Sequence, residues 1–408
     1  MRSGSTSAYL TAARIAGSLR PKWRRPAPYF AVPPAGVSIV IPSRNGRDLL
    51  NANLGTIVEQ TQALPAAEVI VVDNGSSDQT NEWLAAYYAA VRPISSPAPL
   101  SFARAVNLGI AAARYSHVCL LNNDMRIAPG FFDALIDPFR RIPDLFCSTA
   151  QIHFPPGIRR EETGKAVMAQ HHPEDFPLRC DDPLPGEDGT WVLYGSGGCS
   201  VYDIQKLRSL GGMDEAYYPA YVEDLDIGYR AWLRAWPSVY IAGAVVEHRH
   251  RATTSRYYTE AELQIVLEVN YLKFLARAVV SRHVFRRLWQ QAIDRLAAIQ
   301  AREPSARAAL RRAWQLPLEG GELIQPAYPE EQILALTDGS VAVFPGTGRD
   351  PFVVANVSPL AAPPAEMLRR YAEVIVVRGP AGGPSHQAAV DWTRRKWPEL
   401  PALVSAPA

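Results

Sequence analysis

The sequence predicts an α/β fold with a doubly wound, mostly parallel sheet. Residues 37–41, 68–72 and 117–121 form short apolar runs, and the first two are rich in β-branched side chains, which favour strands. Segments whose apolar residues recur at helical spacing separate these runs. Strands that alternate with helices form parallel sheets, because each helix returns the chain to the same edge and covers one face.

The predicted elements of this first half follow in chain order. Residues 48–60 have helical spacing after the first strand, and residues 78–90 have it after the second, where Ser77 is placed as an N-cap. A third helix is predicted over residues 102–113, directly before the third strand. Both faces of the sheet are therefore expected to be covered by helices.

The pattern weakens over residues 151–192, where prolines, His171 and His172 indicate a long loop. Regular patterns then return. The elements predicted next are a strand region over 191–202, a helix over 203–210 that ends at Gly211-Gly212, a helix over 223–236, one or two strands over 239–246, and long basic amphipathic helices over 259–300.

The tail after residue 317 is predicted to be a small α/β appendage of unknown role. Strands are predicted over 332–344, 351–357 and 373–377, and helices over 364–371 and 386–397. The chain is thus predicted to have four parts, which are a basic, proline-rich extension (1–36), the main α/β domain (37–255), a basic helical region (256–317) and the C-terminal appendage (318–408).

Composition excludes several classes of protein. The formal net charge is +2, so no strong overall field draws the chain to nucleic acid. The four cysteines are widely spaced without a CxxC pair, which indicates a reducing compartment rather than a disulfide framework. No uncharged apolar stretch of about eighteen residues and no signal peptide are recognisable, so we expect a cytoplasmic protein without a transmembrane helix.

Two basic segments suggest a membrane contact. Residues 1–25 contain several basic residues and no acid, and residues 277–312 are rich in arginine. Such segments rest on an anionic membrane surface or form solvated helix faces, and the sequence leaves both interpretations open. Peripheral association with the inner face of the cell membrane is therefore one expectation. The oligomeric state is not predicted.

Polar residues follow the predicted strands, where ligands of such sheets bind. These positions are residues 42–45, 73–77 and 122–124. Separately, Glu223 and Asp224 lie among large apolar residues, where charged side chains are rare unless they are paired or used. Two acidic sites that each follow a core-like segment predict a single cleft that holds a metal and a general base.

Four motifs occur in a defined order along the chain. They are VSIVIPSRN (37–45), VVDNGSSD (71–78), SFARAVNLG (101–109) followed by LNND (121–124), and GGMDE (211–215) leading into YVEDLD (221–226). In this order and spacing they resemble the family 2 glycosyltransferases, inverting enzymes of the GT-A fold, and most closely their rhamnosyltransferase-like branch. The resemblance covers about residues 37–280.

The resemblance implies an enzyme of polysaccharide or cell-wall biosynthesis. Such an enzyme moves a sugar from a nucleotide-diphosphate sugar to a hydroxyl of a glycan or lipid-linked acceptor. For this chain the implied donor is dTDP-rhamnose or a UDP-sugar, because the strand-end motifs look like those of the rhamnosyltransferase branch.

On the donor side, the resemblance implies that Asp73 and Asn74 contact the edge of a uracil or thymine base. The family usually has two acids here, but the amide of Asn74 can still pair with the ring. Pro42, Ser43 and Asn45 would line the same pocket. Asn74-Gly75 and Asn45-Gly46 also favour turns by themselves, which is the alternative interpretation.

Arg104 and Asn107 complete the predicted donor site. They lie three residues apart and therefore share one helix face. The resemblance places Arg104 against the donor's diphosphate. The alternative is that Arg104 is a solvated or ion-paired arginine.

Asn122-Asn123-Asp124 occupies the place of the family's DxD metal motif and keeps only the last acid. The resemblance implies a divalent metal, Mg²⁺ or Mn²⁺, that neutralises the diphosphate leaving group. Asp124 is the predicted direct ligand, and Asn123 would hold ribose or a metal-bound water. His248 is the predicted second ligand, with His250 as a substitute, because both lie on one face of an extended segment.

By the same resemblance, Asp224 is the general base. It would take the proton of the acceptor hydroxyl while that oxygen attacks the anomeric carbon. Glu223 would orient the acceptor or raise the pKa of the base through like charge. The alternative is that both are ordinary acids at a helix start. Asp226 and Arg230, four residues apart, are predicted to form a structural pair.

Aromatic residues flank the acidic segment, and they are predicted either to stack on sugar rings or to pack in the core. They are Trp191, Tyr194, Tyr217, Tyr218 and Tyr221.

Three other functions compete with this one. A nicotinamide-dependent oxidoreductase would need GxGxxG after a strand, and residues 42–45 lack it. A sugar nucleotidyltransferase would need a glycine-rich first loop with an arginine and a Pro-Lys pair. Here Arg20-Pro21-Lys22 lies before the first predicted strand, which is the wrong place. A catalytically degenerate nucleotide-sugar-binding or scaffold subunit remains the alternative, because the metal motif is reduced.

Overall fold

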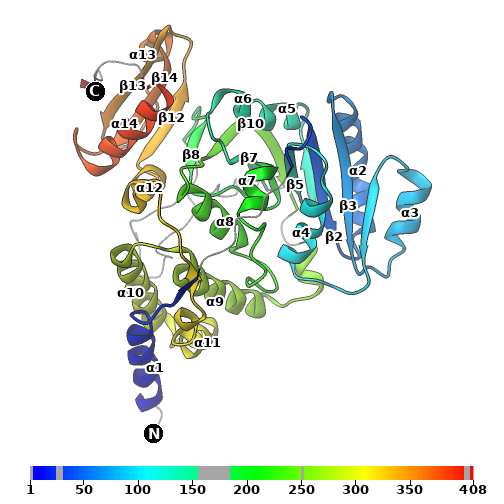
Figure 1. Ribbon diagram of the computed structural model, residues 1–408, viewed down its shortest axis with the longest axis horizontal. Coiled ribbons are helices and arrows are strands. Elements are labelled where there is room, and N and C mark those ends of the chain that lie inside the picture. Colours follow the sequence, from blue (N-terminus) through cyan, green and yellow to red (C-terminus); the bar gives the residue numbers. More distant parts are fainter. Residues whose placement is uncertain (1–2, 24–30, 155–183, 250–251, 399–404, 408) are drawn as a thin grey trace.

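A nine-stranded sheet forms the centre of the protein, with helices on both faces (Figure 1). The structure, a computed structural model, describes residues 3–23, 31–154, 184–249, 252–398 and 405–407. The strands follow the order β4-β3-β2-β5-β9-β7-β10-β6, and β8 pairs with β10. Their bounds are β2 Val37–Ser43, β3 Ala67–Asn74, β4 Arg92–Ser96, β5 His117–Leu121, β6 Met125–Ile127, β7 Cys147–His153, β8 Thr190–Val192, β9 Cys199–Asp203 and β10 Ser238–His248.

The sheet is mostly parallel, as predicted. Strands β2, β3, β4 and β5 are parallel neighbours, and β7 and β10 are parallel to each other. Strand β9 is antiparallel to both β5 and β7, so these two groups run in the same direction. Only β6, β8 and β9 run the other way.

The helices of the described residues include those predicted in the first half of the chain. Their bounds are α1 Ser3–Ala16, α2 Arg47–Gln62, α3 Thr80–Tyr87, α4 Phe102–Ala112, α5 Phe131–Ile136, α6 Pro138–Arg141, α7 Ile204–Ser209, α8 Glu223–Trp232, α9 Glu260–Ala278, α10 Arg282–Ile299, α11 Pro304–Ala313, α12 Glu330–Thr337, α13 Ala365–Arg370 and α14 Pro384–Lys396, with short 3₁₀ turns η1 Thr254–Arg256 and η2 Leu316–Glu319.

Alternating side chains of β2 show why the sheet is covered on both faces. Ile39 and Ile41 belong to the same buried cluster as Leu54 of α2, whereas Val40 belongs to a second cluster with Val106 of α4. Successive strand residues point to opposite faces, so α2 and α4 cover opposite sides of the sheet. The predicted doubly wound α/β class is therefore confirmed.

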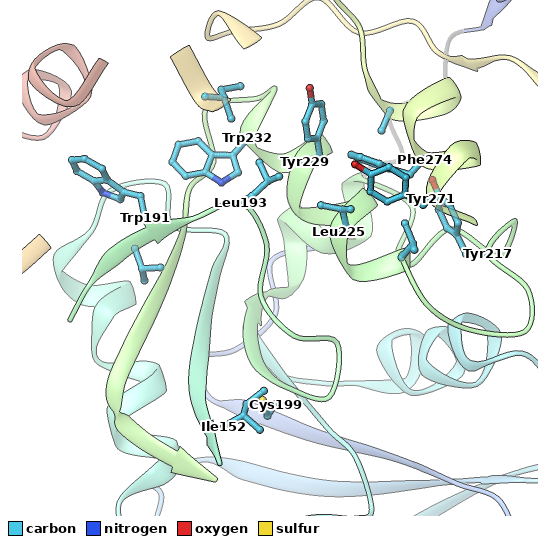
Figure 2. Packing of buried hydrophobic residues seen from close by; sticks show 14 of the residues in the cluster. Ile152, Trp191, Leu193, Cys199, Tyr217, Leu225, Tyr229, Trp232, Tyr271 and Phe274 are labelled. Carbon is cyan, nitrogen blue, oxygen red and sulfur yellow. The ribbon is translucent and has the colours of Figure 1, made fainter. Parts of the chain in front are cut away.

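Helix α8 is fixed between the sheet and α9. Figure 2 shows Tyr229 of α8 beside Phe274 of α9, with ring centroids 5.3 Å apart in an edge-to-face contact. A Cβ at Gly228 would lie 2.5 Å from Cβ of Tyr194, so only glycine allows the helix this close to the preceding strand segment. Trp191 and Tyr217 are buried in the same core. At these two positions the core-packing alternative therefore holds, rather than stacking on a sugar ring.

The C-terminal part contains a four-stranded sheet in the order β12-β14-β13-β15. Its strands are β12 Val341–Pro345, β13 Asp350–Val357, β14 Tyr371–Arg378 and β15 Ser405–Pro407. Residues 332–337, predicted as part of a strand, are helical in α12. There the buried residues Glu330, Ile333, Leu334 and Thr337 recur at helical spacing.

Close contacts tie this C-terminal part to the rest of the chain. Glu330 of α12 accepts hydrogen bonds from the Tyr229 hydroxyl (2.6 Å) and from the backbone N–H groups of Val280 (2.9 Å) and Ser281 (2.6 Å). Before α12, Glu322 forms an ion pair with Arg234 of 2.8 Å. Residues shortly after the predicted boundary at 318 thus contact segments that precede that boundary.

Some local features differ from the predictions, and one predicted loop falls mostly outside the described residues. Gln79, with φ of 61°, is the residue before α3 and provides no side-chain cap, so Ser77 is not the N-cap. Strands β4, β6 and β7 were not predicted, because they are short or lie next to weak patterns. Most of the predicted long loop, with His171 and His172, lies outside the described residues. Within the described ranges, no helix has both the length and the apolar character that a membrane crossing requires.

Candidate functional site

A cleft of about 300 Å³ lies beyond the carboxyl ends of β2 and β5. Asp124 and Asp224 both line it, as predicted from the two separate acidic segments. Of the predicted site residues, those that line the cleft are Pro42, Ser43, Asn74, Asn123, Asp124, Glu223, Asp224 and His248. The cleft is at the edge of a parallel sheet where ligands bind in α/β proteins.

Strand pairing brings Asp124 to His248. Strand β6 begins directly after Asp124, and Met125 lies opposite His248 at the end of β10. The Nε2 atom of His248 is 3.6 Å from Oδ1 of Asp124, and both side chains are largely buried. Oδ1 of Asp124 is shielded from solvent and accepts no hydrogen bond from the described residues. A buried carboxylate oxygen without a donor is costly unless a bound group satisfies it.

The pair of Asp124 and His248 is the only part of the predicted metal site that the structure describes. His250 lies outside the described residues. Within those residues, no group of three or more His, Cys, Asp or Glu side chains is arranged to hold a metal. A metal at Asp124 would therefore have at most two protein ligands from this set and would need oxygens from its substrate.

Asp224 lies in the first turn of α8 and is half-buried. Its Oδ2 atom accepts a hydrogen bond from the backbone N–H of Gly197 (3.2 Å), and its Oδ1 atom accepts one from the N–H of Leu225 (2.8 Å). These two bonds fix the orientation of a carboxylate that still faces the cleft. The geometry suits a group that takes a proton from a bound hydroxyl.

Glu223, the preceding residue, is in a different environment. It is 5% exposed, and its Oε2 atom has no hydrogen-bond partner among the residues that the structure describes. Burial, together with the charges of Asp224 and Asp226, raises the pKa of Glu223 well above its ordinary value of 4.5. A raised pKa favours the uncharged form of Glu223, which weakens the predicted like-charge effect on Asp224.

The predicted pair of Asp226 and Arg230 is confirmed. The two side chains are 2.7 Å apart and nearly fully buried. Asp226 also accepts a hydrogen bond from the Tyr217 hydroxyl (3.0 Å), and Arg230 donates to the backbone oxygen of Leu210 (2.7 Å). This buried network fixes the position of α8 and therefore of the two acids at its start.

Backbone strain precedes these acids. Tyr221 and Val222 have φ values of 73° and 80°, in the left-handed region that β-branched residues rarely adopt. Asn270 of α9 holds the segment by donating to the backbone oxygens of Ala220 (2.9 Å) and Tyr221 (3.2 Å). Such strain persists where surrounding contacts enforce it, and it is typical of functional sites.

Asn123 joins three segments around the cleft. Its Nδ2 atom donates to the Ser43 hydroxyl (2.9 Å), and its Oδ1 atom accepts from the Thr253 hydroxyl (3.1 Å). Both ends of the amide are thus used within the protein. The predicted contact of Asn123 with ribose or a metal-bound water would require one of these bonds to open.

Residues 252–258, a segment that the sequence did not single out, contribute to the cleft through Thr253, Thr254, Tyr257 and Tyr258. The guanidinium of Arg44 lies 3.8 Å from the centre of the Tyr257 ring, and the Tyr257 hydroxyl accepts a hydrogen bond from Asn45 (2.9 Å). The signal available in the sequence was the adjacent tyrosine pair, which was assigned to the basic helical region.

The base-reading prediction for Asp73 and Asn74 receives little support from this geometry. Asp73 does not line the cleft, because its carboxylate accepts from the N–H of Ser76 (3.1 Å) and from Asn81 (2.5 Å). Asn74 lines the cleft, but its amide forms two hydrogen bonds with the backbone of Leu100, of 2.7 and 3.1 Å. The turn interpretation accounts for Asp73.

Three further predicted residues are also engaged elsewhere. Asn45 accepts from the N–H of Ser77 (2.7 Å) and supports Tyr257 from outside the cleft. Arg104 is exposed and pairs with Glu215 (3.1 Å), which is the ion-paired alternative. Asn107 forms hydrogen bonds of 2.9 and 3.0 Å with the backbone of Met213. None of the three lines the cleft, because protein partners hold each one in place.

Comparison with known proteins identifies the domain that contains most of this site. Residues 38–211 match the model of the family described as "Glycosyl transferase family 2". An N-acetylglucosaminyl-diphospho-decaprenol L-rhamnosyltransferase of Mycobacterium tuberculosis is 29% identical over 212 residues, which cover 46% of this chain and 68% of that protein.

Two more distant similarities were found. A validoxylamine A glucosyltransferase of Streptomyces hygroscopicus subsp. jinggangensis is 24% identical over 61% of this chain and 65% of that protein. A crystal structure of S. aureus TarS 1–349 in complex with UDP-GlcNAc has a TM-score of 0.46 at 14% identity and covers 68% of this chain and 81% of that chain. A structural likeness this weak supports no conclusion about function.

The family match agrees with the motifs and with the doubly wound sheet. The predicted resemblance and the predicted enzyme class are therefore confirmed. Residues 38–211 of this chain thus match glycosyl transferase family 2, and the relatives named above are glycosyltransferases.

Proposed function

We propose that the protein transfers a sugar from a nucleotide-diphosphate sugar to an acceptor hydroxyl, with inversion at the anomeric carbon. The observation that carries this proposal is the presence of two different acidic sites on one cleft. Asp124 lies beside His248 with a buried, unsatisfied oxygen, whereas Asp224 is half-buried and oriented by Gly197.

In the proposed reaction, Asp224 accepts the proton of the acceptor hydroxyl. The acceptor oxygen forms a bond to the anomeric carbon on the face opposite the leaving group, and the bond between that carbon and the diphosphate oxygen breaks. The nucleoside diphosphate leaves with the electron pair of that bond. A general base in this position typically contributes about 10²- to 10⁴-fold to the rate.

The residues present fit a divalent cation, and Asp124 and His248 would hold it. The buried Oδ1 atom of Asp124 lacks a hydrogen-bond donor, and oxygen from aspartate together with nitrogen from histidine suits Mn²⁺. When bound, such an ion neutralises charge on a diphosphate. Asn123 contributes to the site by positioning, since Ser43 and Thr253 hold its amide.

The proposed donor is dTDP-rhamnose, with UDP-sugars as the second class. The support is the similarity to the mycobacterial L-rhamnosyltransferase together with the strand-end motifs. The acceptor is proposed to be a glycan or a lipid-linked sugar, because that relative's name places its acceptor sugar on a decaprenol diphosphate.

A donor panel tests the proposal. The full chain is titrated by calorimetry with dTDP-rhamnose, UDP-glucose and UDP-GlcNAc, with and without Mn²⁺, and nucleotide release is measured for each. Metal-dependent binding and release with one of these donors is the expected result. Binding without any release would favour the alternative, a nucleotide-sugar-binding scaffold subunit. The absence of both binding and release with every donor would overturn the proposal.

A further inference from the structure

Exposed apolar side chains gather on one part of the surface. The described residues include ten large apolar side chains that are exposed, and six of them lie on or just after α1 or within residues 314–323. Ile15, Leu19 and Leu323 are the most exposed of the six, at 59%, 62% and 50%. The remaining three are Tyr9, Trp314 and Leu318. Scattered single apolar residues need no explanation, but such a concentration does.

Backbone contacts hold these two segments together. The N–H of Gly321 donates to the oxygen of Pro21 (3.1 Å), and β1 (Lys22–Trp23) pairs with β11 (Gly321–Glu322). This joint lies two residues after Leu19 and two residues before Leu323, so it holds the two segments that carry the exposed apolar residues side by side.

The opposite face of α1 is packed onto the helices behind it. The indole N–H of Trp289 in α10 donates to the backbone oxygen of Ala13 (2.9 Å), and the guanidinium of Arg20 lies 3.9 Å from the centre of the Phe285 ring. Figure 1 shows α1 beside α10 and α11 at the end of the molecule that carries the N-terminus. The apolar stripe with Ile15 and Leu19 therefore faces away from the protein.

The neighbouring surfaces of α10 and α11 are basic. Arg286 and Arg287 of α10 and Arg311 and Arg312 of α11 are exposed. None of the four has an ion-pair partner within the described part of the chain. By contrast, Arg295 on the inner side of α10 is buried and paired with Glu268 at 2.7 Å.

The arginines and the apolar residues are interleaved. Arg311, Trp314 and Leu318 follow one another at spacings of three and four residues and so lie on one stripe along α11 and η2. The exposed acid Asp294 of α10 is already neutralised by Arg14 of α1, at 2.7 Å. Glu319 of η2 is a further exposed acid on this surface, and the four exposed arginines of α10 and α11 outnumber it.

We propose that this basic apolar face, made of α1, residues 314–323 and the exposed arginines of α10 and α11, docks on an anionic lipid bilayer. Arginines attract anionic headgroups, while leucine, isoleucine and tryptophan side chains enter the boundary between headgroups and acyl chains. The charge of the face selects this occupant, because a protein partner would need an acidic surface of matching shape. The inference does not depend on the proposed donor, base or metal.

Vesicle co-sedimentation of the full chain tests this inference. Vesicles of phosphatidylcholine with about 30% phosphatidylglycerol are compared with pure phosphatidylcholine, at low and high salt. We expect binding to the anionic vesicles only, and a decrease with salt. Each arginine near such a surface contributes about fivefold, so the double substitution Arg286→Ala/Arg287→Ala should weaken partitioning by about 25-fold.

Two further variants keep the test sharp. Ile15→Ser/Leu19→Ser removes apolar contact without a change in charge and should weaken binding at low and high salt alike. Arg369→Ala/Arg394→Ala removes the same charge from exposed positions on the C-terminal part and should leave binding unchanged. All six substituted positions are exposed, and each receives a smaller side chain, so we expect every variant to fold. A thermal melt checks this for each variant.

Three outcomes would overturn the inference. The first is equal binding to neutral and anionic vesicles. The second is an equal loss of binding in the Arg369→Ala/Arg394→Ala control. The third is an oligomer, detected by light scattering, that Ile15→Ser/Leu19→Ser dissociates while vesicle binding stays unchanged, since the face would then be a contact between copies of the chain. A failed donor panel would not affect any of these results.

Discussion

Replacement of Asp224 by asparagine tests the assignment of the base. The substitution keeps the size of the side chain and retains an oxygen that can accept the hydrogen bond from Gly197 (3.2 Å), but it removes the ability to take a proton. Asp224 is half-buried and forms no part of the Asp226–Arg230 network, so we expect a folded protein.

The expected size of the effect follows from the role. A general base contributes about 10²- to 10⁴-fold, and each tenfold change corresponds to about 1.4 kcal/mol, so the barrier should rise by about 3–5 kcal/mol. Nucleotide affinity should change little, because the proposed metal ligands Asp124 and His248 are left intact.

The assay measures turnover and affinity on the same samples. Release of nucleoside diphosphate from the best donor of the panel gives the rate, and calorimetry with the same nucleotide gives the affinity. Glu223→Gln is the matched neighbouring variant, because glutamine keeps the size of this buried side chain and Glu223 is not the predicted base, so activity should fall far less. If Asp224→Asn retains more than about a tenth of the wild-type rate, Asp224 is not the base.

Three other predictions follow from named contacts. Asp124→Ala should weaken Mn²⁺-dependent nucleotide binding at least tenfold in calorimetry while the metal-independent part stays, and unchanged affinity would remove its ligand role. Asp226→Ala leaves the Arg230 charge buried and should lower the free energy of unfolding in urea by about 3–5 kcal/mol, whereas Asp137→Ala, which breaks an exposed pair, should cost less than about 1 kcal/mol. The raised pKa of Glu223 means that, above about pH 4.5, the unfolded chain releases a proton that the folded protein keeps, so the free energy of unfolding falls as pH rises until the raised pKa is passed. Glu223→Gln should therefore flatten the dependence of the melting temperature on pH between about pH 4.5 and 8. An unaltered dependence would contradict the assignment.

The cleft that holds Asp124 and Asp224 was predictable from the sequence. The two residues are a hundred positions apart, but each belongs to an acidic site that follows a core-like segment, where a charge is rare unless it is paired or used, and both line one cleft. The pairing of Asp226 with Arg230 was predictable because the helix period alone places the two side chains together.

Contacts between distant segments were not predictable in the same way. Asn107 was assigned to the donor, but its partner is the backbone of Met213, and no periodicity connects the two positions. Arg104 was likewise open to both interpretations, and only the folded chain shows Glu215 beside it. The role of Tyr257 depends on Arg44 and Asn45 of another segment, so the adjacent tyrosine pair by itself does not reveal that it lines the cleft.

The hydrogen bonds of Glu330 have a consequence for the modularity of this enzyme. The carboxylate comes from the C-terminal part, yet one of its donors, Tyr229, belongs to the same helix that begins with Glu223 and Asp224. A shortened gene that ended at residue 317 would leave that hydroxyl and two amide groups of the neighbouring helix start without an acceptor. The C-terminal part thus helps to fix the helix that begins with Glu223 and Asp224, and exchange of this part between relatives would have to preserve the contacts of Glu330.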